Sequence, residues 1–279
     1  MSLKHRVVQR YGAARFQASE ARGGGPVVTH HKLDIITKET SQDCYHFGSN
    51  TRAEPQLVKI TVSKENYLKA IAEAHSEGET VIAATLARWL NVTPPAVATA
   101  VKRLRRDGLI TVDDEGRIAL TAAGEEVANR VLNRHHLIER MLADIFGMEW
   151  YKVHDEAEQL EHAVSEEFEQ RLREKLGDIE VCPHGNRVKV ETPEDKRRRG
   201  LMPLHEAPVS ARARVVSVYE RDRKLLEYLD GLGIRPGAEL ELVARNYDGT
   251  LALRVEGREV SLGEAAAAKL WVEPLDPVQ

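Results

Sequence analysis

Apolar side chains begin to recur at helical spacing near residue 63, after a long N-terminal stretch without a regular period. In the first predicted helix Ser63 is the expected N-cap, and the apolar positions are Tyr67, Leu68, Ile71 and Ala74. A second amphipathic segment carries its apolar positions at Ala83, Leu86, Ala87 and Leu90. The pair Asn91-Val92 interrupts this segment. The folded part of the chain is therefore expected to begin near residue 63.

A third helix is predicted to begin after Thr93, because threonine is a good N-cap and proline suits the first helical turn. Its inner face carries Val97, Val101 and Leu104. The opposite face is small, polar and basic. The candidate DNA-binding residues of this helix are Thr93, Pro95, Ala96, Thr99, Lys102, Arg103 and Arg106. Such a helix can enter a major groove, because small side chains near its N-terminus let the backbone approach the base edges.

Two short strand-like runs, residues 109–112 and 117–120, flank a turn at residues 113–116. Three helices followed by a hairpin predict a winged helix-turn-helix, with the wing lying beside DNA phosphates. The alternative is a winged helix that makes only protein contacts. Because a single domain of low net charge binds DNA weakly, a homodimer on double-stranded operator DNA is expected.

The second half of the chain predicts two long helices and then a β-rich domain. One helix follows Thr121 and ends near residues 145–147, and another spans about residues 155–176. The dimer contact is expected around Ile138, Leu142, Ile145 and Phe146, although the sequence does not separate these residues from intramolecular core. From residue 211 onward, strand-like runs around one helical segment are typical of a small SH3-like β-barrel. The predicted fold class is therefore mainly α with small β parts.

Composition narrows the class of protein. A chain of 279 residues with 42 % hydrophobic residues can build two or three domains. It offers no run of about 20 apolar residues that could span a bilayer, so we expect a cytoplasmic protein without a membrane partner. Cys44 and Cys182 lie far apart, which argues against a disulfide framework. Residues 58–134 carry 11 basic and 10 acidic side chains, whereas residues 135–176 carry 5 and 11, so the second segment is suited to cations.

Histidines and carboxylates recur at helical spacing in that acidic segment. His154, Glu158, Glu161 and His162 stand at i, i+4, i+7 and i+8, which places them on one face of a helix. His135 and Glu139 on the preceding helix also stand at i and i+4. Such groups repel one another or are poorly solvated unless a cation joins them. The alternative is a solvated acidic helix with hydrogen-bonded histidines, but so many ligand-type residues in phase on two consecutive helices favour a divalent metal site.

With both features described, residues 57–186 resemble the diphtheria toxin repressor family of iron- and manganese-dependent regulators, and residues 211–274 resemble its C-terminal SH3-like (FeoA-like) domain. The matching motifs include the segments 65–68 (ENYL), 134–140 (RHHLIER), 152–157 (KVHDEA), 161–162 (EH) and 183–186 (PHGN). The resemblance implies a regulatory metal site formed by Asn66, Glu158, Glu161 and His162. It implies a second site formed by His135, Glu139 and His154, with Cys182, His184 and Glu220 as further candidates.

The resemblance also bears on the metal. Glu158 stands where iron-type members carry cysteine, which leaves the regulatory site with oxygen and nitrogen ligands alone, and such ligands suit Mn(II) better than softer metals. Asn66 departs from the Met or Asp usual at its position, and an amide oxygen ligates without charge. We therefore expect a Mn(II)-activated repressor of metal-uptake genes, with Fe(II) as the alternative metal.

Two other functions compete with this interpretation. A dinuclear metal hydrolase could use the same ligands, but no nucleophile, general base or substrate-phosphate motif accompanies them, so no enzyme and no small-molecule substrate are expected. A DNA-binding protein that does not depend on metal is the other alternative.

The predicted domain boundaries follow from these patterns. Residues 1–56 are expected to be disordered or to arise from an upstream start codon. The domains are then the winged helix-turn-helix (57–122), the helical metal-binding and dimerisation domain (123–186), a linker (187–208) and the SH3-like domain (209–279). The basic run at residues 196–199 of the linker is expected to be solvated, with a DNA contact as the alternative.

Overall fold

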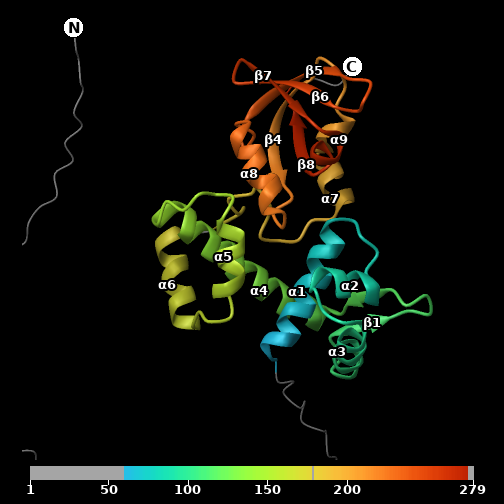
Figure 1. Cartoon of the computed structure of the whole chain (residues 1–279). Helices are drawn as coiled ribbons and strands as arrows, with labels where there is room; N and C mark the ends of the chain where they lie inside the picture. Colours follow the sequence, from blue (N-terminus) through green and yellow to red (C-terminus); the bar gives the residue numbers. More distant parts are fainter. Residues whose placement is uncertain (1–59, 178, 276–279) are drawn as a thin grey trace, which may run out of the picture. The chain divides into compact units, whose positions relative to one another are not determined.

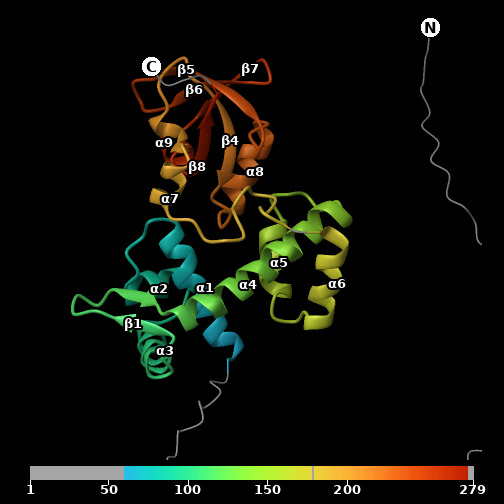
Figure 2. The ribbon, with the colours of Figure 1, turned by 180° about the vertical axis from the view of Figure 1, so that it is seen from behind.

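The computed structural model describes residues 60–177 and 179–275. The expectations for residues 1–56, including Cys44, lie outside these residues. Figure 1 labels the helices and strands along the chain, and Figure 2 shows the same ribbon from behind. Within the described residues no helix is both long and apolar enough to cross a membrane.

The first domain is a winged helix-turn-helix, as predicted (Figure 1). Its helices are α1 (Val62–Ser76), α2 (Ala83–Trp89) and α3 (Pro94–Arg106), and its antiparallel hairpin consists of β1 (Ile110–Val112) and β2 (Ile118–Leu120). The prediction of Ser63 as the first N-cap is wrong. Helix α1 begins at Val62 because the side chain of Thr61 accepts a hydrogen bond from the backbone amide of Lys64. Every residue from Tyr67 to Ala74 is buried, so the middle of α1 is enclosed on all sides.

Helix α4 (Ala122–Arg140) contributes to two hydrophobic cores. Ala128 and Leu132, nearer its start, pack in the core of the winged helix. Leu137 and Ile138, near its end, pack in a second core with residues of η1 (Met141–Ile145), a π-helical turn, and of the helices that follow. One continuous helix therefore connects the DNA-binding domain to the domain that carries the candidate metal ligands.

The single helix predicted for residues 155–176 is wrong, because the structure contains two helices there. They are α5 (Val153–Leu160) and α6 (Glu166–Leu176), and the chain turns between them. Ser165 starts α6 by accepting a hydrogen bond from the amide of Phe168 at 3.2 Å. Glu161 and His162 consequently lie at the C-terminal end of α5, in the turn, and not inside a longer helix.

The residues around the expected dimer contact divide into two groups. Ile138 and Leu142 are buried in the second core of the same chain. Ile145 and Phe146 are 42 % and 69 % exposed. Only the second pair is free to contact another chain.

The predicted linker, residues 187–208, contains regular structure. Helix α7 (Pro193–Arg198) contains most of the basic run, and its Lys196 is buried with Nζ 5.2 Å from the centre of the Trp271 ring. Both guanidinium nitrogens of Arg197 donate to Glu206 at 2.7 Å. These partners within the chain favour a structural role for the run over a DNA contact.

The C-terminal domain is a six-stranded antiparallel sheet (Figures 1 and 2). Its strands run in the order β3-β8-β4-β5-β6-β7. Their bounds are β3 (Met202–Pro203), β4 (Arg212–Val218), β5 (Glu239–Arg245), β6 (Leu251–Val255), β7 (Arg258–Leu262) and β8 (Leu270–Pro274). The short helices of this domain are η2 (Leu204–Glu206), α8 (Arg223–Gly231) and α9 (Glu264–Ala267).

The predicted closure into a barrel is wrong for the part of the chain that the structure describes. The edge strands β3 and β7 do not pair with each other, and β3 has only two residues, which pair with β8. The domain is an SH3-like sheet that remains open. Trp150, from the loop before α5, packs in the core of this domain and donates its indole N–H to Asp230.

The packing of α4 against the wing predicts that Gly124→Ala destabilises the protein. A Cβ atom at residue 124 would lie 2.0 Å from the carbonyl oxygen of Leu109, and backbone cannot move as easily as a side chain. We expect the free energy of unfolding in urea to fall by about 1–3 kcal/mol. Gly231→Ala is the matched control, because Gly231 ends a helix and has no atom within 4 Å of the added Cβ. Equal stability of the two variants would contradict the close contact.

Candidate functional site

Four predicted ligands line one pocket where α1 contacts the end of α5, and three of them, Asn66, Glu161 and His162, lie in contact. We call this group, Asn66, Glu158, Glu161 and His162, the outer cluster. His162 Nε2 lies 2.5 Å from Asn66 Oδ1 and 3.4 Å from Glu161 Oε1. Its Nδ1 lies 2.9 Å from Glu65 Oε2, so α1 contacts both nitrogens of one imidazole. The four residues line one pocket, into which Lys69 and Arg221 also project.

Two basic side chains neutralise the carboxylates of the outer cluster. Lys69, on α1, is only 4 % exposed, and its Nζ donates to Glu161 Oε2 at 2.7 Å. Arg221, which follows β4, donates to Glu158 Oε1 at 3.2 Å and to Glu73 Oε2 at 2.7 Å. A buried carboxylate without a cation would be strongly destabilising. The winged helix and the C-terminal domain each supply one of the cations.

The other predicted ligands come together as an inner cluster. Its members are His135, Glu139, His154, Cys182, His184 and Glu220. Glu139 lies at its centre and is fully buried. Its Oε1 atom is 3.1 Å from His135 Nε2 and 3.2 Å from His154 Nδ1. The same oxygen is 3.4 Å from His184 Nδ1.

Glu220 brings the C-terminal domain into the inner cluster. Its Oε2 atom accepts a hydrogen bond from Asn186 Nδ2 at 2.7 Å and lies 3.3 Å from Cys182 Sγ. It is also 3.5 Å from His184 Nδ1. Four residues, His135, Glu139, His154 and Glu220, offer ligand atoms that all lie within 4.8 Å of one another. That spacing suits coordination of one ion by nitrogen and oxygen.

The donor atoms of the inner cluster fit a divalent metal. Glu139 Oε2 is buried and accepts no hydrogen bond from any described residue, and an isolated buried lone pair of this kind is stabilised by a cation. His184 Nε2 lies 2.9 Å from the carbonyl oxygen of Trp150, which can only accept a hydrogen bond, so Nε2 carries a hydrogen. Although burial opposes this, Glu139 raises the pKa of His184, and loss of the Nδ1 proton would leave the lone pair of Nδ1 directed toward the cluster while Nε2–H stays bonded to Trp150, as in a histidine ligand held by an outer hydrogen bond.

Electrostatics keep these carboxylates ionised. Burial raises the pKa of Glu161, but the hydrogen bond from His135 and the charge of Lys69 outweigh it and lower that pKa to about 2. Burial and the charge of Lys69 lower the pKa of His135, but Glu139 and Glu161 outweigh them and raise that pKa to about 9. Burial, together with Glu220, raises the pKa of the Cys182 thiol. A metal that binds His135 or Cys182 must therefore displace a proton, whereas the carboxylate of Glu161 has none to lose.

The two clusters share contacts. His135 Nδ1 of the inner cluster lies 2.7 Å from Glu161 Oε2 of the outer cluster. His154 Nε2 lies 3.6 Å from Glu158 Oε1. Since both imidazoles contact a carboxylate of each cluster, a change of charge in one cluster is felt in the other.

Several residues of the site were missed by sequence reasoning. His136 offers a nitrogen to a second possible ligand group, with Glu139, Cys182 and Glu220. Lys69 and Arg221 have no local signal, because their partners are distant in sequence. Glu65 and His136 lie within the motifs 65–68 and 134–140, next to the predicted ligands Asn66 and His135. This adjacency is the sequence signal that could have identified them.

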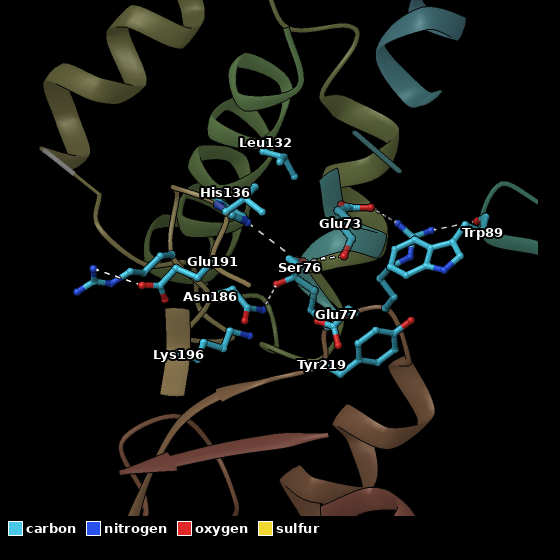
Figure 3. A pocket seen from close by; sticks show the side chains of 14 residues that line it. Glu73, Ser76, Glu77, Trp89, Leu132, His136, Asn186, Glu191, Lys196 and Tyr219 are labelled. Carbon is cyan, nitrogen blue, oxygen red and sulfur yellow. Dashed lines mark hydrogen bonds and ion pairs between the residues drawn. The ribbon is translucent and has the colours of Figure 1, made fainter. Parts of the chain in front are cut away.

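A second pocket lies between α1, α4 and the C-terminal domain (Figure 3). Figure 3 shows Glu77, Lys196, His136 and Tyr219 among the side chains that line it. Burial raises the pKa of Glu77 and lowers that of Lys196, since each is withdrawn from water. Arg221 and Glu220 also line this pocket, so it marks the place where the C-terminal domain meets α1.

The predicted DNA-reading face of α3 is exposed. All seven candidates are on the surface: Thr93, Pro95, Ala96, Thr99, Lys102, Arg103 and Arg106. Val97 and Leu104 are buried on the opposite face. In the wing, Asp113 accepts a hydrogen bond from the amide of Arg117 at 2.7 Å and so tightens the turn between β1 and β2. The helix therefore presents small residues at its N-terminus and basic residues along its length.

Three family models match successive segments of the chain. The model "Iron dependent repressor, N-terminal DNA binding domain" matches residues 59–117. The model "Iron dependent repressor, metal binding and dimerisation domain" matches residues 121–188, and the FeoA domain matches residues 202–274. The diphtheria toxin repressor of Corynebacterium diphtheriae is 34 % identical over 221 residues, covering 76 % of this chain and 96 % of the relative.

Other relatives extend the comparison. The iron-dependent repressor IdeR of Mycobacterium tuberculosis is 31 % identical over 230 residues, covering 78 % of this chain and 98 % of the relative. A solved structure of a manganese-dependent transcriptional repressor in complex with manganese has a TM-score of 0.68 and 30 % identity, covering 76 % of this chain and all of the other. The manganese regulator SloR has a TM-score of 0.62 and 28 % identity, covering 76 % and 98 %. The chain therefore belongs to the iron-dependent repressor family that includes the diphtheria toxin repressor, and it is a metal-dependent DNA-binding transcriptional regulator and not an enzyme.

Proposed function

We propose that this protein is a homodimeric repressor of metal-uptake genes that binds operator DNA when Mn(II) occupies the outer cluster. The observation that carries the proposal is the contact between Asn66 of the DNA-binding domain and His162 of the metal domain, 2.5 Å apart. Because the ligands come from two domains, binding of one metal ion would also fix the position of the DNA-binding domain relative to the metal-binding domain. Because its partner is DNA, we expect the protein to act in the cytoplasm.

The residues of the outer cluster determine what a bound ion can do. Glu158, Glu161 and His162 extend from the end of α5, and Asn66 extends from α1. A divalent ion supplies the positive charge that draws these groups together. Asn66 then holds α1 against α5, and through α1 the orientation of α3 is held as well, since α1 and α3 pack in one core. The metal-bound state must bind DNA more tightly for this to regulate, since equal affinity shifts no population.

The choice of Mn(II) rests on the outer-cluster ligands. They are one amide oxygen, two carboxylates and one imidazole, and no sulfur atom is among them. Oxygen and nitrogen ligands suit Mn(II), whereas thiolates select softer metals. Cys182 belongs to the inner cluster, where burial keeps its thiol protonated in the absence of a cation. Fe(II) accepts the same ligands and is the competing metal.

The homodimer is proposed on the exposed apolar surface that follows α4. Ile145 and Phe146 are exposed, although large apolar side chains are usually buried. A two-fold dimer through this surface would place two copies of α3 on the two halves of a symmetric operator.

The direct test is DNA binding by the metal-stripped full-length chain to the duplex upstream of its own gene. Fluorescence anisotropy would be recorded while Mn(II), Fe(II) without oxygen, or Zn(II) is titrated. We expect Mn(II) to tighten binding at a lower free concentration than Fe(II). Activation by Fe(II) at lower concentration would reassign the metal, and unchanged binding in chelator would refute metal dependence.

Removal of an outer-cluster ligand is predicted to weaken metal binding. Glu161→Gln deletes one charge from a carboxylate that contacts Lys69 and His135, so the Mn(II) affinity should fall by at least about 10- to 100-fold in equilibrium dialysis. Glu139→Gln should abolish binding of a different ion, at the inner cluster. The exposed Glu167→Gln, on α6, is the control. An unchanged affinity and stoichiometry in both cluster variants would refute the proposed sites.

Arg103→Ala is predicted to weaken DNA binding without affecting metal binding. Arg103 is exposed on α3, where a guanidinium can bond to a guanine edge or a phosphate. We expect an affinity loss of about 1–3 kcal/mol in saturating Mn(II), measured by anisotropy. Arg171→Ala, at an exposed position on α6, should match wild type. If Arg171→Ala is the more damaging change, α3 is not the reading helix.

A further inference from the structure

Arg221 of the C-terminal domain joins three segments of the other two domains. Its Nη1 donates to Glu73 of α1 at 2.7 Å and to Glu158 of α5 at 3.2 Å. Its Nη2 donates to the carbonyl oxygen of Trp89 at 3.3 Å. The guanidinium also lies 4.9 Å from the centre of the Trp89 ring, within cation–π distance. Figure 3 labels Glu73 and Trp89 among the side chains that line the same pocket as Arg221.

Arg221 and its neighbour Glu220 contact different clusters. Glu220 accepts a hydrogen bond from Asn186 and contacts His184 in the inner cluster, whereas Arg221 contacts Glu158 in the outer cluster. Two adjacent residues of opposite charge therefore connect one turn of the C-terminal domain to both clusters. A change of charge at Glu158 acts directly on this turn.

The two cations of the outer cluster differ in how firmly they are held. Lys69 is almost fully buried, with Glu161 at 2.7 Å and Glu73 and Glu158 both at 3.8 Å. Arg221 contacts the same Glu158 carboxylate as Lys69 does, but on the solvent-exposed side of the cluster, where the Glu158 side chain is 40 % exposed. Glu158 Oε1 is the atom that Arg221 contacts, so a metal ion bound to this carboxylate would lie close to a like charge.

We propose that Arg221 is a displaceable cation of the outer cluster, through which the C-terminal domain competes with the metal for Glu158. The inference rests on the proposed metal site at the outer cluster. When Glu158 turns to a metal, Arg221 loses one of its two carboxylate partners and retains Glu73. The contact of the C-terminal domain with α5 is thereby lost, and the guanidinium, then held by Glu73, changes its position over the Trp89 ring. The C-terminal domain in this way sets the metal concentration at which the protein responds.

The test compares full-length wild type, Arg221→Met and Arg223→Met in Mn(II) titrations by equilibrium dialysis. Methionine keeps much of the apolar length of arginine and removes its charge. We expect Arg221→Met to bind Mn(II) at the outer cluster about three- to tenfold more tightly, because a competing charged hydrogen bond is gone. Arg223, the exposed first residue of α8, forms an ion pair with Asp155 at 3.6 Å, and its variant should match wild type.

A second measurement follows the contact itself. Trp89 fluorescence, obtained as the difference between wild type and Trp89→Phe, should change when Mn(II) is added to wild type and to Arg223→Met. It should not change in Arg221→Met, which lacks the stacked guanidinium. If Arg221→Met does not fold, the measurement on the wild-type chain can still refute the inference.

Two results would overturn the inference. One is an Arg221→Met affinity for Mn(II) equal to or weaker than that of wild type, and the other is a wild-type Trp89 emission that ignores Mn(II). If Glu161→Gln binds Mn(II) as wild type does, the proposed outer site itself fails and the inference falls with it. If Glu161→Gln loses binding but Arg221→Met does not gain it, the site stands and only the competition by Arg221 is refuted.

Discussion

The structure depends on one buried carboxylate, that of Glu161, which lies where the three helices α1, α4 and α5 meet. It is 2 % exposed and accepts a hydrogen bond from Lys69 of α1, while His135 of α4 lies 2.7 Å away. A carboxylate withdrawn from water is tolerated only with cations and hydrogen-bond donors around it. The DNA-binding domain and the metal domain are therefore held together by charge as well as by apolar packing.

The same requirement explains why each domain contributes to the clusters. The winged helix supplies Asn66 and Lys69, α4 and α5 supply most ligands, and the C-terminal domain supplies Glu220 and Arg221. Helix α4 spans two hydrophobic cores, so its ligands His135 and Glu139 are fixed against both. A regulator built in this way responds to a change in cluster charge with a change in domain contacts. It needs no long-range signal, because the domains touch at the ligands.

The sequence predicts local features of this arrangement well. Spacing alone indicated the ligand face of α5 and the exposed face of α3, because helical periodicity fixes which side chains share a side. Contacts between distant segments were not predictable: Lys69 and Glu161 are 92 residues apart, and Arg221 and Glu158 are 63 apart. The turn after α5 was missed because Glu161, His162 and Ala163 are all compatible with a helix. The open sheet was missed because strand patterns do not specify closure.

The central claim is that metal and DNA bind the same conformation, and thermodynamic linkage tests it most directly. The measurement is the Mn(II) affinity of the full-length protein, by equilibrium dialysis, with and without a saturating operator duplex. The account predicts tighter Mn(II) binding on DNA, by the same factor by which Mn(II) tightens DNA binding. An identical Mn(II) affinity in the two conditions would contradict it.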